Sequence, residues 1–375
     1  MLHPINLPAS HLALANTVEL QRRLMAWLCA SSTTGADVVD YNTAIVNLTA
    51  RENAVKDWLK WYCRQQDILP AIQHIAGLTF SKAVKPIAGK SAVLEWFEDS
   101  FRFPEHFDPK NCAPTPWPDE LPFSDETNAH LKAFLSGFYK KAFSKSRGLP
   151  FNSAGNAVGT GLTNRDYKDD FKKNNFGCVC PACDGDYDVS GEEKDHWIAM
   201  DYFPSLSVMP LNLVLLCHRC NSSEFKHNKR TFSTSPAKPF DAWFHPWLRP
   251  AATGISVKCV NLQPKVKAIC NADNIKVENL NKLLGIEKRW ELLAKRQKGE
   301  FIRHLVARIE AGDDDTIPLV ERELKLAISH AQSSLRKEPH SLVRKAVFDE
   351  ALASPAMVRA WLLEAQQTLA QRAIP

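Results

Sequence analysis

Two Cys-x-x-Cys pairs constrain the fold of this chain more than any other feature of its sequence. Cys180 and Cys183 form the first pair, Cys217 and Cys220 form the second, and 33 residues lie between the pairs. Four thiolates in this arrangement predict a closed, tetrahedral site for a structural Zn²⁺ ion. Cys178 stands two residues before Cys180, so the sequence leaves open which of the two is the ligand.

The other cysteines carry no such pattern. Cys29, Cys63, Cys112, Cys259 and Cys270 are scattered, and we expect them to be buried as small apolar residues. The first residues lack a basic start followed by an apolar run, and no stretch approaches the roughly 18 apolar residues of a membrane helix. We therefore expect a cytoplasmic protein with no membrane contact. Disulfides are uncommon in the reducing cytosol.

Length and composition indicate a folded chain of more than one unit. The chain has 375 residues, of which 45% are hydrophobic and 24% charged, values near the globular average. Because this is long for one core, we expect three parts. These are a helical N-terminal domain over residues 1–125, a domain with the cysteines over 126–250, and short strands followed by a helical domain over 251–375.

Apolar spacing predicts the helices at both ends of the chain. Leu20, Leu24, Trp27 and Leu28 share one helix face, as do Ile302, Leu305, Val306 and Ile309. The region around 255–270 alternates like short strands, and the Pro- and aromatic-rich residues 101–123 are typical of a connecting segment. The predicted fold class is therefore mainly α with a small α+β insert.

Positive charge gathers beside the cysteine pairs. From Phe138 to Asn175 there are eight Lys or Arg against three Asp, a net charge of +5 (8 − 3) in this run alone. A second basic group, "KHNKR", covers Lys226 to Arg230. A solvated basic face would explain either run by itself, but two runs flanking one predicted zinc site favour contact with phosphates.

The residues between the cysteine pairs have a pattern of their own. Asp195-His196 is followed by Asn212 ahead of the apolar run "LVLLC", and then by Cys220-Asn221. This resembles the HNH nuclease family, and in particular the subgroup in which Cys-x-x-Cys pairs bracket a ββα-metal motif. The resemblance covers residues 178–250, about a fifth of the chain. It implies that a first strand ends in Asp195-His196, that Asn212 precedes a second strand, and that Asn221 opens a helix.

The resemblance also implies an activity, that of a metal-dependent endonuclease. His196 would be the general base, and Asp195 and Asn221 would hold a catalytic Mg²⁺ or Mn²⁺ ion at the scissile phosphate. Asn212 would brace the loop or orient His196. These residue types suit the chemistry, because neutral imidazole accepts a proton near neutral pH and oxygen ligands suit hard cations.

Two departures from the family pattern leave alternatives open. Glu224 stands where relatives often carry Lys, which leaves Lys226 or His227 as a phosphate contact and His227 as an alternative metal ligand. Lys194 stands where many relatives carry an apolar strand residue.

The resemblance names double-stranded DNA as the expected substrate, with RNA as an alternative. The segment "FDAWFHPWLRP", in which we expect His245 to serve packing, and the tail that includes "NKLLGIEKRWELL" are similar to parts of Septu-like and retron-associated anti-phage HNH proteins. That similarity implies an ATPase or another defence protein as partner.

The main alternative is a zinc-stabilised module that binds nucleic acid or protein without hydrolysis. A zinc hydrolase is disfavoured, because four thiolates leave no open coordination position.

Overall fold

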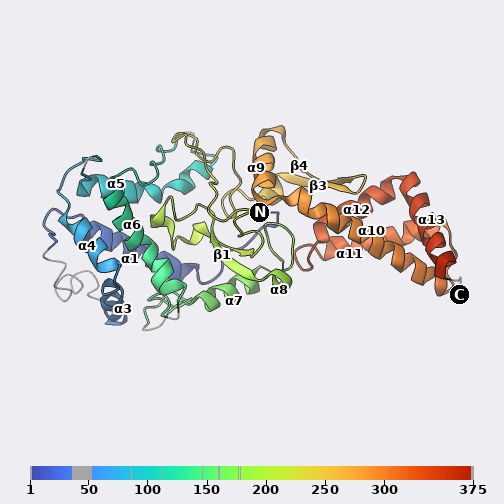
Figure 1. Cartoon of the computed structure of the whole chain (residues 1–375), viewed down its shortest axis with the longest axis horizontal. Helices are drawn as coiled ribbons and strands as arrows, with labels where there is room; N and C mark the ends of the chain where they lie inside the picture. The colour runs from blue at the N-terminus through green and yellow to red at the C-terminus, as the bar shows by residue number, and fades with distance from the viewer. Residues whose placement is uncertain are drawn as a thin grey trace.

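A computed structural model describes residues 2–35 and 53–372, apart from positions 86, 112, 146, 159–160, 176 and 178. The molecule is elongated, with N-terminal helices at one end, C-terminal helices at the other and a small hairpin between them (Figure 1). Its described residues are mainly helical and contain two two-stranded antiparallel sheets. This confirms a mainly α chain with a small β insert. The domain boundaries at 125 and 250 stay predictions, and the buried side chains form one continuous cluster from one end to the other.

Five α-helices and a π-helical turn make up the described N-terminal part. They are α1 (His11–Leu28), α3 (Asn53–Cys63), α4 (Ile68–Gly77), α5 (Lys90–Ser100) and α6 (Asp125–Gly137), and α6 continues into the π-helix η3 (Phe138–Phe143). The predicted helix face is confirmed, since Leu20, Leu24 and Leu28 are buried. At the start of α6, Ser124 Oγ accepts a hydrogen bond from the backbone N–H of Thr127, which caps the helix.

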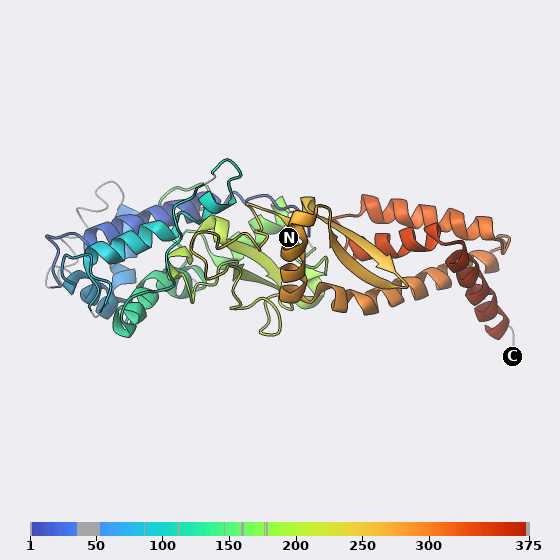
Figure 2. The same ribbon diagram turned by 90° about the horizontal axis from the view of Figure 1, so that it is seen from above.

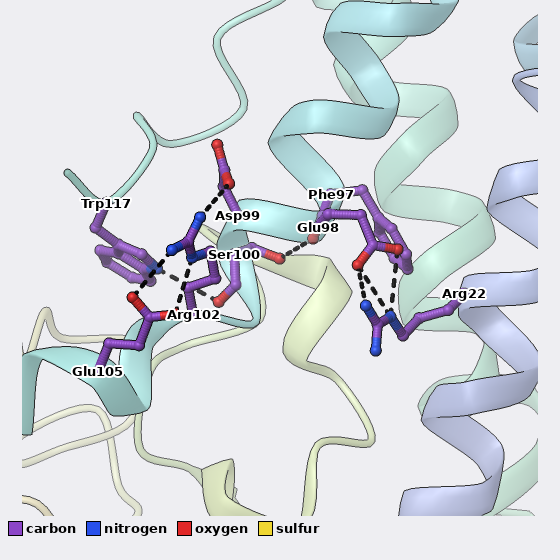
Figure 3. Close-up of polar contacts among 8 residues, drawn as sticks. All are labelled: Arg22, Phe97, Glu98, Asp99, Ser100, Arg102, Glu105 and Trp117. Atoms are coloured by element: carbon purple, nitrogen blue, oxygen red, sulfur yellow. Dashed lines mark hydrogen bonds and ion pairs between the residues drawn. The ribbon is translucent and has the colours of Figure 1, made fainter. Parts of the chain in front are cut away.

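Residues 101–123 do more than connect two parts. Their only described helix is the short 3₁₀ turn η2 (Phe103–Phe107). The Trp117 ring stacks on Phe203 with a centroid separation of 3.9 Å, and its Nε1 donates to the carbonyl of Ser100 at 3.3 Å. Figure 3 shows the hydrogen bond between Trp117 and Ser100, and also the ion pair that joins Arg22 of α1 to Glu98 of α5. The segment therefore fixes α5 to the centre of the molecule.

The central hairpin pairs the two strands predicted between the cysteine pairs. β1 (Glu192–His196) runs antiparallel to β2 (Leu213–Cys217), with Glu192 opposite Cys217 and His196 opposite Leu213. Every residue of β2 is buried. The hydroxyls of Tyr167, on α7 (Asn164–Asn174), and of Tyr187, on α8 (Tyr187–Ser190), donate to β2 carbonyls at 3.3 and 2.6 Å. These bonds satisfy the edge of β2 that β1 does not cover. The loop between the strands contains the 3₁₀ turns η4 (Pro204–Leu206) and η5 (Pro210–Asn212).

The helix expected after Asn221 is absent from the described residues, and this part of the prediction is wrong. Residues 218–228 form successive turns. Phe225 N–H donates to the carbonyl of Ser222 at 3.0 Å, and His227 has φ of +29°, which ends any helical run. Two serines after Asn221 favour such local bonds over a helix, and the buried Phe225 ring packs against Gly285, where an added Cβ would lie 2.5 Å from it. Of the expected ββα arrangement, the described residues contain the two paired strands, and turns follow them in place of a helix.

The C-terminal part begins with the 3₁₀ turn η6 (Ala251–Thr253) and the predicted strands, here β3 (Ile255–Val260) and β4 (Gln263–Ala268). After the 3₁₀ turn η7 (Asn271–Asp273) come α9 (Asn274–Leu284), α10 (Ile286–Glu310), α11 (Ile317–Ser333), α12 (Ser341–Ala353) and α13 (Pro355–Arg372). β3 packs on α12 and β4 on α10, so that the hairpin lies along these helices (Figure 2). The predicted face of α10 is confirmed, with Ile302, Leu305 and Val306 buried. Among the described helices, none has both the length and the apolar character that crossing a bilayer requires.

Candidate metal centre and the Asp195-His196 pair

The four predicted cysteines meet in one buried cluster. The sulfur atoms of Cys180, Cys183, Cys217 and Cys220 all lie within 4.8 Å of one another, and Cys183 Sγ is 3.7 Å from Cys217 Sγ. A tetrahedral zinc ion with Zn–S bonds of about 2.3 Å places its sulfurs about 3.8 Å apart. The cluster therefore has the ligand type and spacing that suit a structural zinc ion. Cys178 lies outside the described residues.

Two tight turns bring the sulfurs together. At the first pair, Cys180 N–H donates to the carbonyl of Gly185 at 2.8 Å, and Asp184 N–H donates to the carbonyl of Cys180 at 2.9 Å. Asp184 takes the left-handed conformation, with φ of +62°, which Asp tolerates better than most residues. At the second pair, Cys217 N–H donates to Cys180 Sγ at 3.3 Å. Burial raises the pKa of Cys180, whereas hydrogen bonds from Cys180 and its neighbours lower the pKa of Cys217.

Arg289, in the first turn of α10, clamps the cysteine cluster from outside. Its Nη1 donates to Cys220 Sγ at 3.1 Å and its Nη2 donates to Cys183 Sγ at 3.2 Å. Burial opposes the charge of the guanidinium, but the thiolates of Cys183 and Cys220 outweigh this and raise the pKa of Arg289. The next residue, Trp290, donates from Nε1 to the carbonyl of Cys183 at 3.1 Å. Sequence reasoning missed both, because nothing in a helical segment some 70 residues after Cys220 marks a partner of the cluster.

The first cysteine turn also joins the N-terminal residues to the start of α12. His3 Nε2 lies 2.7 Å from Asp184 Oδ1, and both side chains are buried. Asp184 Oδ2 accepts a hydrogen bond from the N–H of Leu342 at 2.7 Å, and the carbonyl of Asp184 accepts one from His340 N–H at 2.6 Å. The cysteine cluster is therefore a junction for the N-terminus, the hairpin and the helices α10 and α12.

His196 ends β1 in a fixed orientation. Its Nε2 donates to the carbonyl of Ser207 at 2.8 Å, and Ser207 is itself held by a hydrogen bond from its Oγ to the carbonyl of Leu135 at 2.7 Å. A carbonyl accepts only, so Nε2 carries the proton and Nδ1 carries the lone pair. The side chain is buried under Tyr139, whose ring centroid is 4.5 Å from that of His196. Burial lowers the pKa of His196 to about 3 and keeps the imidazole neutral.

Asp195 is buried beside Lys226, whose side chain has no exposed surface. Asp195 Oδ2 lies 3.0 Å from Lys226 Nζ, at angles outside those of a hydrogen bond. Nζ donates instead to the carbonyls of His196 and His227, at 2.5 and 3.0 Å. Burial raises the pKa of Asp195, while the Lys226 ammonium opposes that rise. Lys226, considered a phosphate contact on sequence grounds, thus lies inside the protein as a counter-ion.

Asn212 braces the loop between the strands. Its Oδ1 accepts a hydrogen bond from Ile198 N–H at 2.7 Å, and its Nδ2 donates to the carbonyls of Ile198 and Leu206 at 2.9 and 3.2 Å. The side chain is fully buried, with no surface left for substrate. Asn212 therefore holds the loop that contains Ser207. The Ser207 carbonyl in turn fixes the orientation of His196.

Asn221 and His227 are less closely joined to the Asp195-His196 pair. Asn221 is half-buried, and its Nδ2 donates to Glu193 Oε2 at 2.7 Å. Glu193 Oε1 also accepts from His218 Nδ1 at 2.7 Å, so the three side chains form a polar group on the surface of the hairpin. His227 is exposed and belongs to no cluster of metal-ligating side chains among the described residues.

Lys194 is buried among aromatic rings, as an apolar strand residue at this position would be. Its Nζ lies 3.4 Å from the centroid of Phe143 and 4.7 Å from that of Tyr139, and it has no hydrogen-bond partner among the described residues. Burial lowers the pKa of Lys194 to about 6, so the amine is mostly neutral at neutral pH. His245 likewise serves packing: its Nδ1 accepts the N–H groups of Trp247 and Leu248 at 3.3 and 3.2 Å.

The remaining cysteines follow their prediction in part. Cys29, Cys63 and Cys259 are buried, whereas Cys270 is exposed shortly after β4, and Cys112 lies outside the described residues.

No family model matches this chain, and the comparisons with curated proteins and with solved structures find no match either.

Proposed function

We propose that this chain is a zinc-stabilised endonuclease of the ββα-metal type, in which His196 is the general base. The observation that carries the proposal is the orientation of His196 at the end of β1. Its Nε2 is held by the Ser207 carbonyl, and Nδ1 makes no hydrogen bond within the described chain. A neutral ring with one nitrogen fixed and the other free is equipped to take a proton from an attacking water.

Asp195 and Asn221 supply the oxygen atoms that a hard cation prefers. Asp195 Oδ2 is a buried carboxylate oxygen that accepts no hydrogen bond from the described residues, and it would coordinate a divalent ion in place of its ion pair with Lys226, which lies 3.0 Å away. Asn221 presents its amide nitrogen to Glu193, which leaves its oxygen for a ligand role. Mg²⁺ or Mn²⁺ bound there would neutralise charge on the scissile phosphate. His227 has no part in this arrangement.

Cationic side chains line a pocket beside the start of β1. The pocket has a volume of about 600 Å³, and Lys145, Arg165 and Lys168 face it together with Asp169 and Glu192. Glu192 is four residues from His196 along β1, which at about 3.3 Å per residue is roughly 13 Å. We infer that this pocket binds a phosphate that flanks the scissile one, because its Lys and Arg side chains belong to the basic run between Phe138 and Asn175.

Substrate needs an opening to reach His196, which is only 6% exposed. Tyr139 covers its ring from the π-helix η3, and such π-helical turns are frequent at functional sites. Displacement of η3 would expose Nδ1 without disturbing the Ser207 hydrogen bond. A trigger of this kind suits a nuclease kept inactive until a partner acts, and an ATPase in an anti-phage system is our proposal for that partner from the sequence resemblance alone.

One observation favours a second function, that of a zinc-stabilised binding module without hydrolysis. The Lys226 ammonium lies 3.0 Å from Asp195, where it already balances the carboxylate and would repel a divalent ion. A module that only binds nucleic acid or protein would not need Asp195 as a metal ligand. The two functions therefore predict different effects of replacing Asp195 on nucleic-acid cleavage.

The test is cleavage of supercoiled plasmid and of total RNA by the full chain, with Mg²⁺ or Mn²⁺, and with zinc content measured for every preparation. Asp195→Asn removes the proposed ligand while keeping the shape of the side chain. Asp186→Asn, at a carboxylate beside the first cysteine turn, is the matched control. The nuclease predicts divalent-dependent cutting that Asp195→Asn abolishes and the control retains.

Products should carry 5′-phosphate and 3′-hydroxyl ends, as the family resemblance implies. Nucleic acid bound with equal affinity by the parent and Asp195→Asn, and cut by neither at any divalent concentration or with η3 opened by Tyr139→Ala, would establish the binding module instead. Cleavage of RNA but not DNA would keep the mechanism and change the substrate.

A further inference from the structure

A second cluster of metal-ligating side chains lies far along the chain from the cysteines, between α4 and α6. It consists of His74 on α4, and Glu126 and His130 on α6. One ligand atom from each lies within 4.8 Å of those of the other two. Glu126 and His130 are separated by four positions, so both project from the same face of α6. No role is given to these residues by the proposed endonuclease.

The two imidazole rings lie face to face. Their centroids are 4.3 Å apart at an interplanar angle of 25°, and His74 Nδ1 is 3.8 Å from Glu126 Oε1. That separation is too long for a hydrogen bond, so the carboxylate and the ring face each other without a direct bond. Glu126 is 74% exposed on its side chain and His74 is 19% exposed, which leaves the cluster open to solvent.

An outer hydrogen bond orients His74 toward the centre of the cluster. His74 Nε2 lies 3.1 Å from Thr127 Oγ1, and Ser124 Oγ contacts the same hydroxyl at 3.1 Å. Thr127 is buried at the start of α6, so this partner is fixed. A hydroxyl can donate or accept, so this contact fits both tautomers of His74; in the tautomer whose Nε2 donates to Thr127, Nδ1 carries the lone pair on the side of Glu126. Metal-bound histidines commonly have their second nitrogen held in this manner.

We propose that His74, Glu126 and His130 form a binding site for a transition-metal ion such as Zn²⁺. Two imidazoles and one carboxylate are a ligand set that zinc, nickel and cobalt accept. Three protein ligands leave a fourth position for water or for a group from another molecule, in contrast to the closed cysteine cluster. The ion would clip α4 to α6, the helix that continues into η3 and Tyr139.

The test uses the full chain with its cysteine cluster loaded with zinc, to which Co²⁺ is added in measured equivalents. Cobalt on nitrogen and oxygen ligands shows weak visible bands, whereas cobalt on thiolates adds strong charge-transfer absorption. We expect one further equivalent to bind without thiolate absorption and to raise the thermal midpoint of unfolding. Glu126→Gln and His130→Ala should each weaken this binding roughly tenfold or more, and Thr127→Val by about tenfold.

The matched control is His330→Ala, because His330 faces the carboxylate of Glu338 at 3.6 Å but has no third metal-ligating side chain beside it in the described part of the chain. This variant should bind cobalt as the parent does. Glu126 is exposed, so Glu126→Gln tests the site without a risk to folding. The inference is overturned if the zinc-loaded chain takes up no further cobalt, or if Glu126→Gln and His130→Ala bind it as tightly as the parent.

Discussion

Arg289 offers the sharpest test of how the cysteine cluster is held. Arg289→Met keeps most of the volume of the side chain and removes both of its N–H contacts to sulfur, at 3.1 and 3.2 Å. A zinc ion with four thiolates carries a net charge of −2, and Arg289 is the cation in direct contact with two of its sulfurs. The perturbation therefore acts on the metal ligands through their outer shell.

The expected loss can be worked from these two contacts. Hydrogen bonds to charged groups contribute about 1.5–3 kcal/mol each, but the guanidinium is only partly buried, so solvent screens part of that interaction. We therefore expect roughly 1.4–2.8 kcal/mol for the pair, which is a 10- to 100-fold loss of zinc affinity. The zinc affinity of Arg289→Lys should lie between those of Arg289→Met and the parent, because an ammonium lacks the planar fork that spans two sulfurs.

The assay is competition for zinc between the protein and a chromophoric chelator. Arg296→Met, on the exposed side of the same helix and paired with Glu300, is the control and should keep the parent affinity. A zinc affinity of Arg289→Met within twofold of the parent would refute the reasoning, and would mean that the guanidinium only packs beside the cluster.

Two further predictions concern buried ionisable groups. Lys226→Met should lower the free energy of unfolding by about 3–5 kcal/mol in urea titrations, because it leaves the buried Asp195 carboxylate without its counter-ion; Asp195→Asn in the same chain should restore much of this, and a loss below about 1 kcal/mol would contradict the pairing. Burial holds the pKa of His245 well below its usual 6.5, so the stabilisation is fully present above pH 6.5 and lost as the pH falls below it. His245 alone should contribute a slope of up to about 1.4 kcal/mol per pH unit to the free energy of unfolding, in addition to the contribution of buried His196. The fall of the thermal midpoint between pH 7 and pH 5 should therefore be shallower in His245→Asn than in the parent; equal slopes would remove His245 as a cause.

The sequence predicted those features that depend on local pattern. Helices α1 and α10 followed from apolar residues at helical spacing, and the four-cysteine cluster followed from two spaced pairs, since both signals are carried by neighbours in sequence. The short strands β3 and β4 were predicted from alternation for the same reason, whereas their pairing as a hairpin is seen only in the structure. The helices and strands were predicted from residues that are close in sequence, and the metal cluster from two short motifs that are each recognisable by themselves.

Features that depend on distant contacts could not be predicted. The helix expected after Asn221 is replaced by turns because Phe225 packs on Gly285, 60 positions away. From the sequence alone, Lys226 is expected to be a surface cation, but in the structure it is buried against Asp195. Arg289 contacts the cysteines only because α10 packs beside them. His74 and His130, on different helices, likewise show no shared pattern in the sequence.

The central claim is that His196 takes the proton from the attacking water. Its most direct test is the single-turnover rate of plasmid cleavage by His196→Ala and by His330→Ala, each with the zinc content of the parent. General-base catalysis is typically worth 10²- to 10⁴-fold, so we predict a loss of about that size for His196→Ala and none for His330→Ala. Equal cleavage rates for parent and His196→Ala, at equal zinc content, would contradict the claim.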